Sequence, residues 1–344
     1  MNNDKAYIKT IVENEGLEFV GITDINIDAN IINVFEHWIN QYLYLDLKYL
    51  LKNLNIKKDI QAVLPDAKSI IMIGLNHYCG DTISTIYNSF IPTIAQYARF
   101  IDYHYILKQK CNVIVQKLKS KYSNLIAKIC VDTAPILEKF LATKTGAGFV
   151  GKNSLFIHYE KGSFINLAEI ITNLDFNPDI ADNLQLSQCM KQCETCKLCI
   201  QSCPFGAIND NFTINPSKCL SYWSIEAKQM IPEYMWEGFK YYYFGCDICQ
   251  LICPWNNKAI PTTRPKLNFE QQNLEQFIYI DKVQFKQYYA KSVLSRLKHE
   301  LFLRNILIAL YQTKNENIKK IANKFIEHDS QILQETARII LQRL

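Results

Sequence analysis

Eight of the twelve cysteines fall within residues 193–253, and their spacing restricts this chain more than any other feature. The first run reads C-x2-C-x2-C-x3-C-P and the second reads C-x2-C-x3-C-P. Cysteines in such numbers could form disulfides, but the N-terminal stretch MNNDKAYIKTIVENEG has no apolar signal core. We therefore expect a cytoplasmic protein with reduced thiols. In that setting, the clustering predicts metal ligation.

The first run is typical of iron–sulfur clusters rather than zinc. Zinc takes four ligands, usually from two CxxC knuckles a dozen or more residues apart. The run found here is that of bacterial ferredoxins, in which three thiolates bind one [4Fe–4S] cluster and the fourth binds a second cluster. The predicted ligands are Cys193, Cys196, Cys199 and Cys253 for cluster one, and Cys203, Cys219, Cys246 and Cys249 for cluster two, with Cys189 as the alternative to Cys219. Clusters closed by four thiolates carry electrons, so the chemistry must lie elsewhere.

Composition bounds the rest of the molecule. The chain has 344 residues, enough for two or three domains, and 49% of them are hydrophobic, which excludes a disordered protein. No apolar run reaches the roughly 18 residues that a membrane span needs. The formal net charge of +5 permits an anionic partner without requiring one.

Helical and strand patterns alternate in the first half of the chain. We predict strands at residues 67–78, 124–132, 154–160 and 164–172, helices at 100–122 and 134–145, and a helix that runs into a strand at 7–20. The alternation predicts an α/β or α+β domain over residues 1–178. A ferredoxin-like double-cluster domain at 179–260 and a helical, HEAT-like domain at 261–344 complete the predicted organisation.

Two features near residue 140 have competing interpretations. GAGFVG, residues 146–151, matches GxGxxG, but a predicted helix precedes it and a strand follows, the reverse of a dinucleotide site. Its glycines instead favour a tight turn with close backbone approach. Asp132 is either the N-cap of the helix that Pro135 begins, or an acid at the end of a strand, where such sheets place ligands.

Several blocks together resemble the epoxyqueuosine reductase family, which is related to reductive dehalogenases. They are PDAKSII (65–71), VDTAPILEKFLATKTGAGFVGKNSLFI (131–157) and FGCDICQLICPWN (244–256), and the likeness covers nearly the whole chain. The resemblance implies base-off cobalamin without a protein histidine on cobalt, two [4Fe–4S] clusters and a low-potential electron donor. It further implies a tRNA substrate whose wobble base, epoxyqueuosine, is reduced to queuosine with two electrons and two protons.

The resemblance also implies roles for individual residues. Asp132 matches the proton donor, and we expect burial against the corrin to keep it a neutral acid. The implied cobalamin contacts are Lys57, Tyr97, Asp132, Lys152, Asn153, Phe156, Leu167, Ser221 and Asp247. Lys57 replaces an arginine that is frequent in the family, and lysine cannot make the bidentate fork. His104 is interpreted as a polar helix-face residue or a contact to the ligand periphery.

Three functions remain open from the sequence. The first is a cobalamin-dependent tRNA-modifying reductase, and the second is a dehalogenase-like reductase of a small molecule. The third is an eight-iron electron carrier without catalysis. For the tRNA reductase, the aromatic residues at 222–223, 241–243 and 255 are candidates to stack the base, or else pack around the clusters. We expect a monomer, because one chain can supply both the clusters and the pocket.

Overall fold

The main sheet lies in the N-terminal half of the molecule. The computed structural model describes residues 3–89, 91–132, 134–178, 191–267 and 273–344. Its four main strands lie in the order β1 (Glu18–Asp24), β2 (Ser69–Asn76), β7 (Ile165–Thr172) and β4 (Ala127–Cys130). All three pairings are antiparallel. Of the two predicted fold classes, the antiparallel sheet therefore matches α+β. The α/β class, which alternating helices and strands also suggest, would have a parallel sheet.

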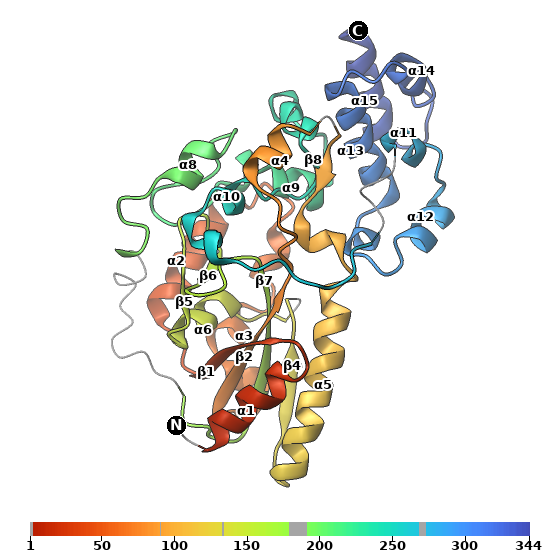
Figure 1. The fold of residues 1–344 in the computed structure, drawn as a ribbon. Helices are drawn as coiled ribbons and strands as arrows, with labels where there is room; N and C mark the ends of the chain where they lie inside the picture. Colours follow the sequence, from red (N-terminus) through yellow and green to blue (C-terminus); the bar gives the residue numbers. More distant parts are fainter. Residues whose placement is uncertain (1–2, 90, 133, 179–190, 268–272) are drawn as a thin grey trace.

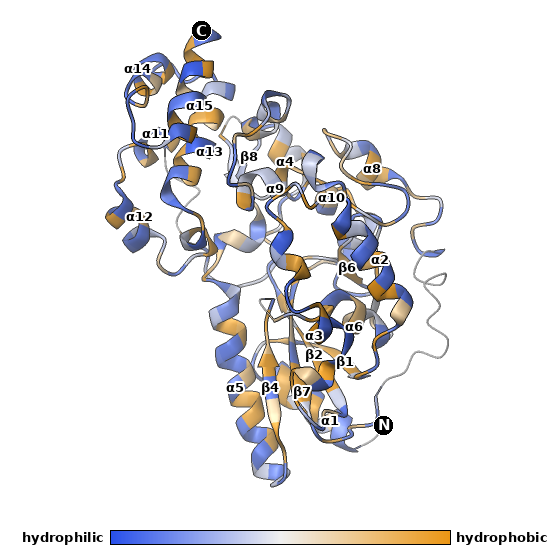
Figure 2. Cartoon of the chain, turned by 180° about the vertical axis from the view of Figure 1, so that it is seen from behind, coloured by the Kyte–Doolittle hydropathy of each residue, from blue (hydrophilic) through white to orange (hydrophobic). Residues whose placement is uncertain are grey.

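Helices cover both faces of this sheet (Figure 1). Helices α1 (Asn3–Glu13) and α5 (Tyr103–Lys121) pack on one face, where α5 covers Ile71 and Ile73 of β2. Helix α6 (Glu138–Lys144) covers the other face, which carries Ile70 and Met72. Successive side chains of a strand point to opposite faces, so a strand between two helical layers is apolar throughout. In Figure 2, α5 alternates between hydrophobic and hydrophilic residues, as expected for a helix with one buried face.

Helix α6 begins later than the sequence predicts. The expected start was near Ala134, but the first helical residue is Glu138 and Leu137 occupies the N-cap position. Residue 134 precedes a proline, which disfavours helical backbone, and the N–H of Ile136 instead closes a tight turn on the carbonyl of Ala134. Asp132 therefore does not cap α6, and the N-cap interpretation is wrong.

The glycines of residues 146–151 shape a hairpin of β5 (Gly148–Val150) and β6 (Phe156–His158). Gly146 has φ +74°, a backbone conformation that favours glycine. A Cβ on Gly148 would lie 2.2 Å from the carbonyl oxygen of Ile157, so that position has no room for a side chain. The prediction of a tight turn with close backbone approach is confirmed.

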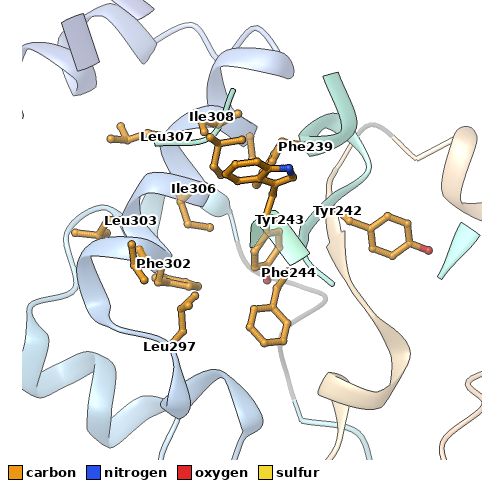
Figure 3. Close-up of a cluster of buried hydrophobic side chains, with 14 of the residues drawn as sticks. Phe239, Tyr242, Tyr243, Phe244, Leu297, Phe302, Leu303, Ile306, Leu307 and Ile308 are labelled. Carbon is orange, nitrogen blue, oxygen red and sulfur yellow. The ribbon is translucent and has the colours of Figure 1, made fainter. Parts of the chain in front are cut away.

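One hydrophobic core joins the cysteine-rich segment to the C-terminal helices. The cysteine-rich segment contributes α8 (Leu198–Ser202), α9 (Leu220–Ile225), β8 (Tyr242–Phe244) and α10 (Ile248–Leu251). The C-terminal part contains α11 (Leu274–Phe277), α12 (Lys282–Tyr288), α13 (His299–Gln312), α14 (Ile318–Asn323) and α15 (Gln331–Gln342). Figure 3 shows Phe302 and Ile306 of α13 beside Tyr243 of β8. They belong to a core that extends from Leu220 to Ile340 and also takes in residues of the N-terminal half such as Ile39 and Ala98. The three-domain division stays a prediction.

Two adjacent polar side chains of α13 secure this junction. Arg304 is fully buried, and its guanidinium donates to the carbonyls of Trp223, Ala227 and Gln229 and to the side chain of Asn305. Asn305 in turn donates to the carbonyls of Ser224 and Tyr243. Helix α13 thereby holds the backbone on the C-terminal side of Cys219 and on the N-terminal side of Cys246.

Shorter elements complete the fold. They are α2 (Ala29–Asn40), α3 (Leu54–Lys58), α4 (Ile83–Tyr87) and β3 (Thr93–Ile94), of which β3 pairs in parallel with β8. Within the ranges that the structure describes, no helix has both the length and the hydropathy to cross a membrane.

Candidate active site

A cavity of about 580 Å³, here called the central cavity, lies where the sheet, the cysteine-rich segment and the segment before α13 meet. Three thiols assigned to cluster two line it, those of Cys219, Cys246 and Cys249. Seven of the predicted cobalamin contacts also line it: Tyr97, Asp132, Asn153, Phe156, Leu167, Ser221 and Asp247. The fold thus brings residues as far apart in the sequence as Tyr97 and Cys249 to the central cavity.

A second cavity of about 560 Å³, the side cavity, adjoins the first. Its walls are mostly apolar, with Phe35 and Trp38 of α2 and Phe140 of α6 among them. Both cavities share Asp132, Glu138, Lys139, Ile214, Cys219, Ser221 and Glu226. Asp132 therefore stands at the junction, and its side chain is 49% exposed because it faces open space.

His104 orients Asp132. His104 Nε2 lies 2.9 Å from Asp132 Oδ2, and His104 Nδ1 lies 2.7 Å from Asp102 Oδ1. Asp102 is also the N-cap of α5 and accepts the backbone N–H of His104. The fold thus joins Asp102, His104 and Asp132 in a carboxylate–imidazole–carboxylate chain, although His104 and Asp132 are 28 positions apart in the sequence. The interpretation of His104 as a helix-face residue missed this contact, because no local spacing signals it.

The expected neutral acid is not what this geometry favours. Burial raises the pKa of Asp132, but the hydrogen bond and charge of His104, helped by Tyr103, outweigh burial and leave the pKa below its ordinary value. Burial alone would lower the pKa of His104, yet its bonds to Asp102 and Asp132 raise it. The two carboxylates therefore favour the protonated form of the imidazole, whose Nε2 lies within hydrogen-bond distance of Asp132.

Further carboxyl groups surround this pair. Glu138, the first residue of α6, lines both cavities, and burial raises its pKa to about 7, with Asp132 adding to the rise. Glu169 of β7 is fully buried, and neither of its carboxyl oxygens accepts a hydrogen bond from the described residues. Burial raises its pKa well above the ordinary range, and Glu138 adds to this. Both acids are neutral over part of the range in which Asp132 is charged.

Glu138→Gln should make stability less dependent on pH. The groups that act on Glu138 are Asp132, His104, Lys139 and Glu169. Because its pKa rises from 4.5 to about 7 on folding, its contribution to the free energy of unfolding falls as pH rises through that interval. The variant should gain on the order of 2 kcal/mol at about pH 8 and nothing at about pH 4.

Thermal unfolding across this pH range measures the effect. The Tm of Glu138→Gln should overtake that of the unsubstituted protein as pH rises. Glu327→Gln, at an exposed position, serves as the control and should show no such trend. A constant difference between Glu138→Gln and the parent at all pH values would contradict the assignment.

The structure brings the predicted cluster ligands together in two groups. Cys253, whose pKa burial raises to about 11, interacts with Cys193, Cys196 and Cys199. Burial also raises the pKa of Cys249, which interacts with Cys246 and Cys219 and, more weakly, with Cys199 and Cys203. Cys219 and Cys246 both interact with Cys203. Among the described residues, no group of three or more His, Cys, Asp or Glu side chains is placed to hold a single metal ion. Cys189 lies outside the described residues.

Two of the predicted cobalamin contacts lie away from the central cavity. Lys57 lines the side cavity, where burial lowers its pKa and its ammonium lies 5.7 Å from the ring centroid of Phe35. Lys152 lines neither cavity. Its ammonium instead donates to the carbonyls of Glu194 and Cys196, beneath the first cysteine run.

Most of the aromatic candidates for base stacking pack in the interior. Trp223, Tyr242 and Tyr243 are buried in the core shared with α13. Tyr222 borders the side cavity, and its hydroxyl accepts the backbone N–H of Asp46. Trp255 packs against Phe149 and Tyr159 of the hairpin. Tyr241 packs against the same core and edge-on to Tyr87. Of these six candidates, only Tyr222 lines one of the two cavities.

Comparisons with known proteins agree with this architecture. Residues 57–133 match the family model described as "Epoxyqueuosine reductase QueG, DUF1730", and residues 192–256 match "4Fe-4S double cluster binding domain". The second match shows that the cysteine-rich segment binds iron–sulfur clusters.

Individual relatives extend the likeness over the whole chain. An epoxyqueuosine reductase from Cyclobacterium marinum is 32% identical over 303 residues, which cover 87% of this chain and 94% of the relative. The solved epoxyqueuosine reductase of Streptococcus thermophilus is 25% identical with a TM-score of 0.85, and the match covers 99% of this chain and 90% of that one. A solved relative that carries an epoxyqueuosine-modified tRNA-Tyr stem loop is 23% identical, with a TM-score of 0.83 and coverage of 98% and 90%. The chain belongs to the epoxyqueuosine reductase family.

Proposed function

We propose that this protein reduces the epoxide of epoxyqueuosine, at the wobble position of tRNA, to the alkene of queuosine. One observation carries the proposal: the Asp132–His104 pair and three thiols assigned to cluster two line the same cavity. A proton source and an electron source therefore face one reaction space. The net change consumes two electrons and two protons and releases water.

Cobalamin fits the central cavity. Its corrin ring has apolar faces and a rim of primary amides, which need apolar walls and scattered polar partners. Phe156 and Leu167 supply apolar wall. His77 Nδ1 and Asn166 Oδ1, which also border the cavity, make no hydrogen bond of normal geometry within the described residues, although the two side chains lie close together. When bound, cobalamin would supply a low-valent cobalt reductant that side chains cannot provide.

Distinct tasks fall to the residues around that cofactor. The predicted contacts other than Lys57 and Lys152 would hold it in the central cavity in its base-off form, and Lys57 would act from the side cavity. Asp132 and His104 would present a proton to the epoxide oxygen as charge develops there. Asp247 is buried, with one carboxyl oxygen 2.7 Å from the Gln96 backbone nitrogen, and fixes the loop beside Cys246.

Electrons would arrive through the two groups of cysteines. Cluster one would take Cys193, Cys196, Cys199 and Cys253, and cluster two would take Cys203, Cys219, Cys246 and Cys249. Because Cys219, Cys246 and Cys249 line the cavity, the second group would hold its cluster beside the reaction space, and the two clusters would supply single electrons from a low-potential donor. The side cavity has Asp132 and Tyr222 on its wall, and its other walls are mostly apolar. It would therefore give the substrate an apolar surface beside Asp132.

The decisive experiment supplies the purified monomeric protein, reconstituted with iron and sulfide, with cobalamin, a low-potential reductant and an anticodon stem–loop that carries epoxyqueuosine. Mass analysis of the nucleosides should show conversion to queuosine that depends on cobalamin. Cobalamin binding without conversion would favour a small-molecule reductase instead. Eight irons without any cobalamin binding would reduce the protein to an electron carrier.

A further inference from the structure

Lys152 is a buried cation beside the first cysteine run, outside the space proposed for catalysis. Its side chain is 3% exposed and follows the last residues of β5. The ammonium lies 3.1 Å from the carbonyl oxygen of Glu194 and 3.2 Å from that of Cys196. It also lies 2.6 Å from Asp210 Oδ1. The lysine charge is therefore held against the carbonyl of one predicted ligand of cluster one, Cys196, and against that of the residue after another ligand, Cys193.

Asp210 and Lys197 complete a small charged group. Asp210 Oδ2 lies 3.1 Å from Lys197 Nζ, and both of these side chains are 55% exposed. Two cations and one anion leave a net positive charge next to the segment that carries Cys193, Cys196 and Cys199. Lys152 is the shielded member, so solvent and salt weaken its field least.

A fixed charge of this kind bears on electron affinity. When a four-thiolate cluster accepts one electron, its net charge becomes more negative by one, with no other bond made or broken. A nearby cation stabilises the reduced form and raises the reduction potential, whereas a nearby anion lowers it. Hydrogen bonding and limited solvent exposure act on the same potential.

We propose that Lys152 raises the reduction potential of cluster one and that Asp210 moderates this effect. Each electron from the low-potential one-electron donor would then rest at cluster one until cluster two has passed its own electron to the cavity. The inference depends on the proposed function only for the direction of electron flow. Lys152 would act as a tuning residue, because it lines neither of the two cavities.

An anaerobic redox titration of the reconstituted full-length protein, followed by electron paramagnetic resonance, tests the proposal without cobalamin or tRNA. Lys152→Gln keeps hydrogen-bond donors and removes the charge. At a fixed potential, it should lower the ratio of reduced to oxidised cluster one about tenfold, a shift of about 59 mV to more negative potential. Asp210→Asn should shift the same one-electron wave in the opposite direction, and Lys152→Arg should restore it.

Controls separate tuning from a purely structural role. Lys161→Gln removes an equal charge from a partly exposed pair with Glu18 and should move neither wave. If the midpoint stays fixed in Lys152→Gln, or if Lys152→Gln and Asp210→Asn move it in the same direction, the proposal is overturned. If Lys152→Gln does not assemble cluster one, Asp210→Asn tests the proposal alone. In that variant the reduction potential of cluster one must rise, and an unchanged or lower potential overturns the proposal. Absence of two cluster signals in the unsubstituted protein would instead count against the proposed function.

Discussion

Asp132→Asn should lower single-turnover formation of queuosine by about 100-fold or more, within the range that a positioned general acid contributes. The amide keeps the shape of the carboxyl group but cannot relay the proton held by His104, whose Nε2 lies 2.9 Å from Asp132 Oδ2. Reduction of the epoxide without prompt protonation would leave a poor leaving oxygen. Rapid-quench analysis of a pre-reduced, cobalamin-loaded sample with the modified stem–loop gives the rate.

The same variant should remain otherwise intact. Because Asp132 does not cap α6, the change should cost only about 1 kcal/mol of stability, for the weakened bond to His104. Iron content and the absorption spectrum of bound cobalamin should match those of the parent. His104→Gln should show a smaller loss of rate, since Asp132 can still take protons from solvent. Full activity of Asp132→Asn would exclude it as the proton donor.

Arg304→Met should destabilise the protein by about 3–5 kcal/mol, the cost of breaking a buried ionic or hydrogen-bonded arrangement from one side. Methionine fills similar space, but the carbonyls of Trp223, Ala227 and Gln229 lose their buried donor. Burial already lowers the pKa of this guanidinium to about 9. Its retention as a cation depends on the hydrogen bonds that it makes with all five N–H groups.

Denaturant unfolding under anaerobic conditions measures the loss. Arg338→Met on the exposed surface of α15 is the matched control and should change stability by about 0.5 kcal/mol or less. The Arg304 variant should also release iron at lower denaturant concentration, because the tethered loops carry Cys219 and Cys246. Equal stability of the two variants would show that the buried network contributes little.

The sequence predicts the parts of this molecule that depend on local chemistry. The strand predicted at 67–78 follows from the apolar run at its centre, residues 70–75, and β2 lies within it. The grouping of the cysteines follows from motif spacing. The tight turn at 146–151 follows from its glycines, which allow backbone conformations and close contacts that other residues do not. The strand and the turn depend on residues within a few positions of one another, and the cysteine grouping depends on two short motifs whose spacing is local.

What the sequence misses depends on distant residues. His104 meets Asp132 only because α5 packs on the sheet against β4, the strand that Asp132 follows. The antiparallel order of the strands follows from how the connections cross, which hydrophobic periodicity does not encode. Lys152 points under the first cysteine run rather than into the cavity because Asp210 and two carbonyls hold it there.

The grip of Arg304 and Asn305 on the backbone near Cys219 and Cys246 makes the last helices part of the redox machinery. Residues far down the chain fix the loops that carry Cys219 and Cys246, two of the proposed ligands of cluster two. Truncation from the C-terminal end should therefore affect the cysteine-rich segment as well as the helices that are removed. Loss of α13 would remove the hydrogen bonds that hold these loops, so a change more than fifty residues beyond the final cysteine would disturb the proposed ligands of cluster two.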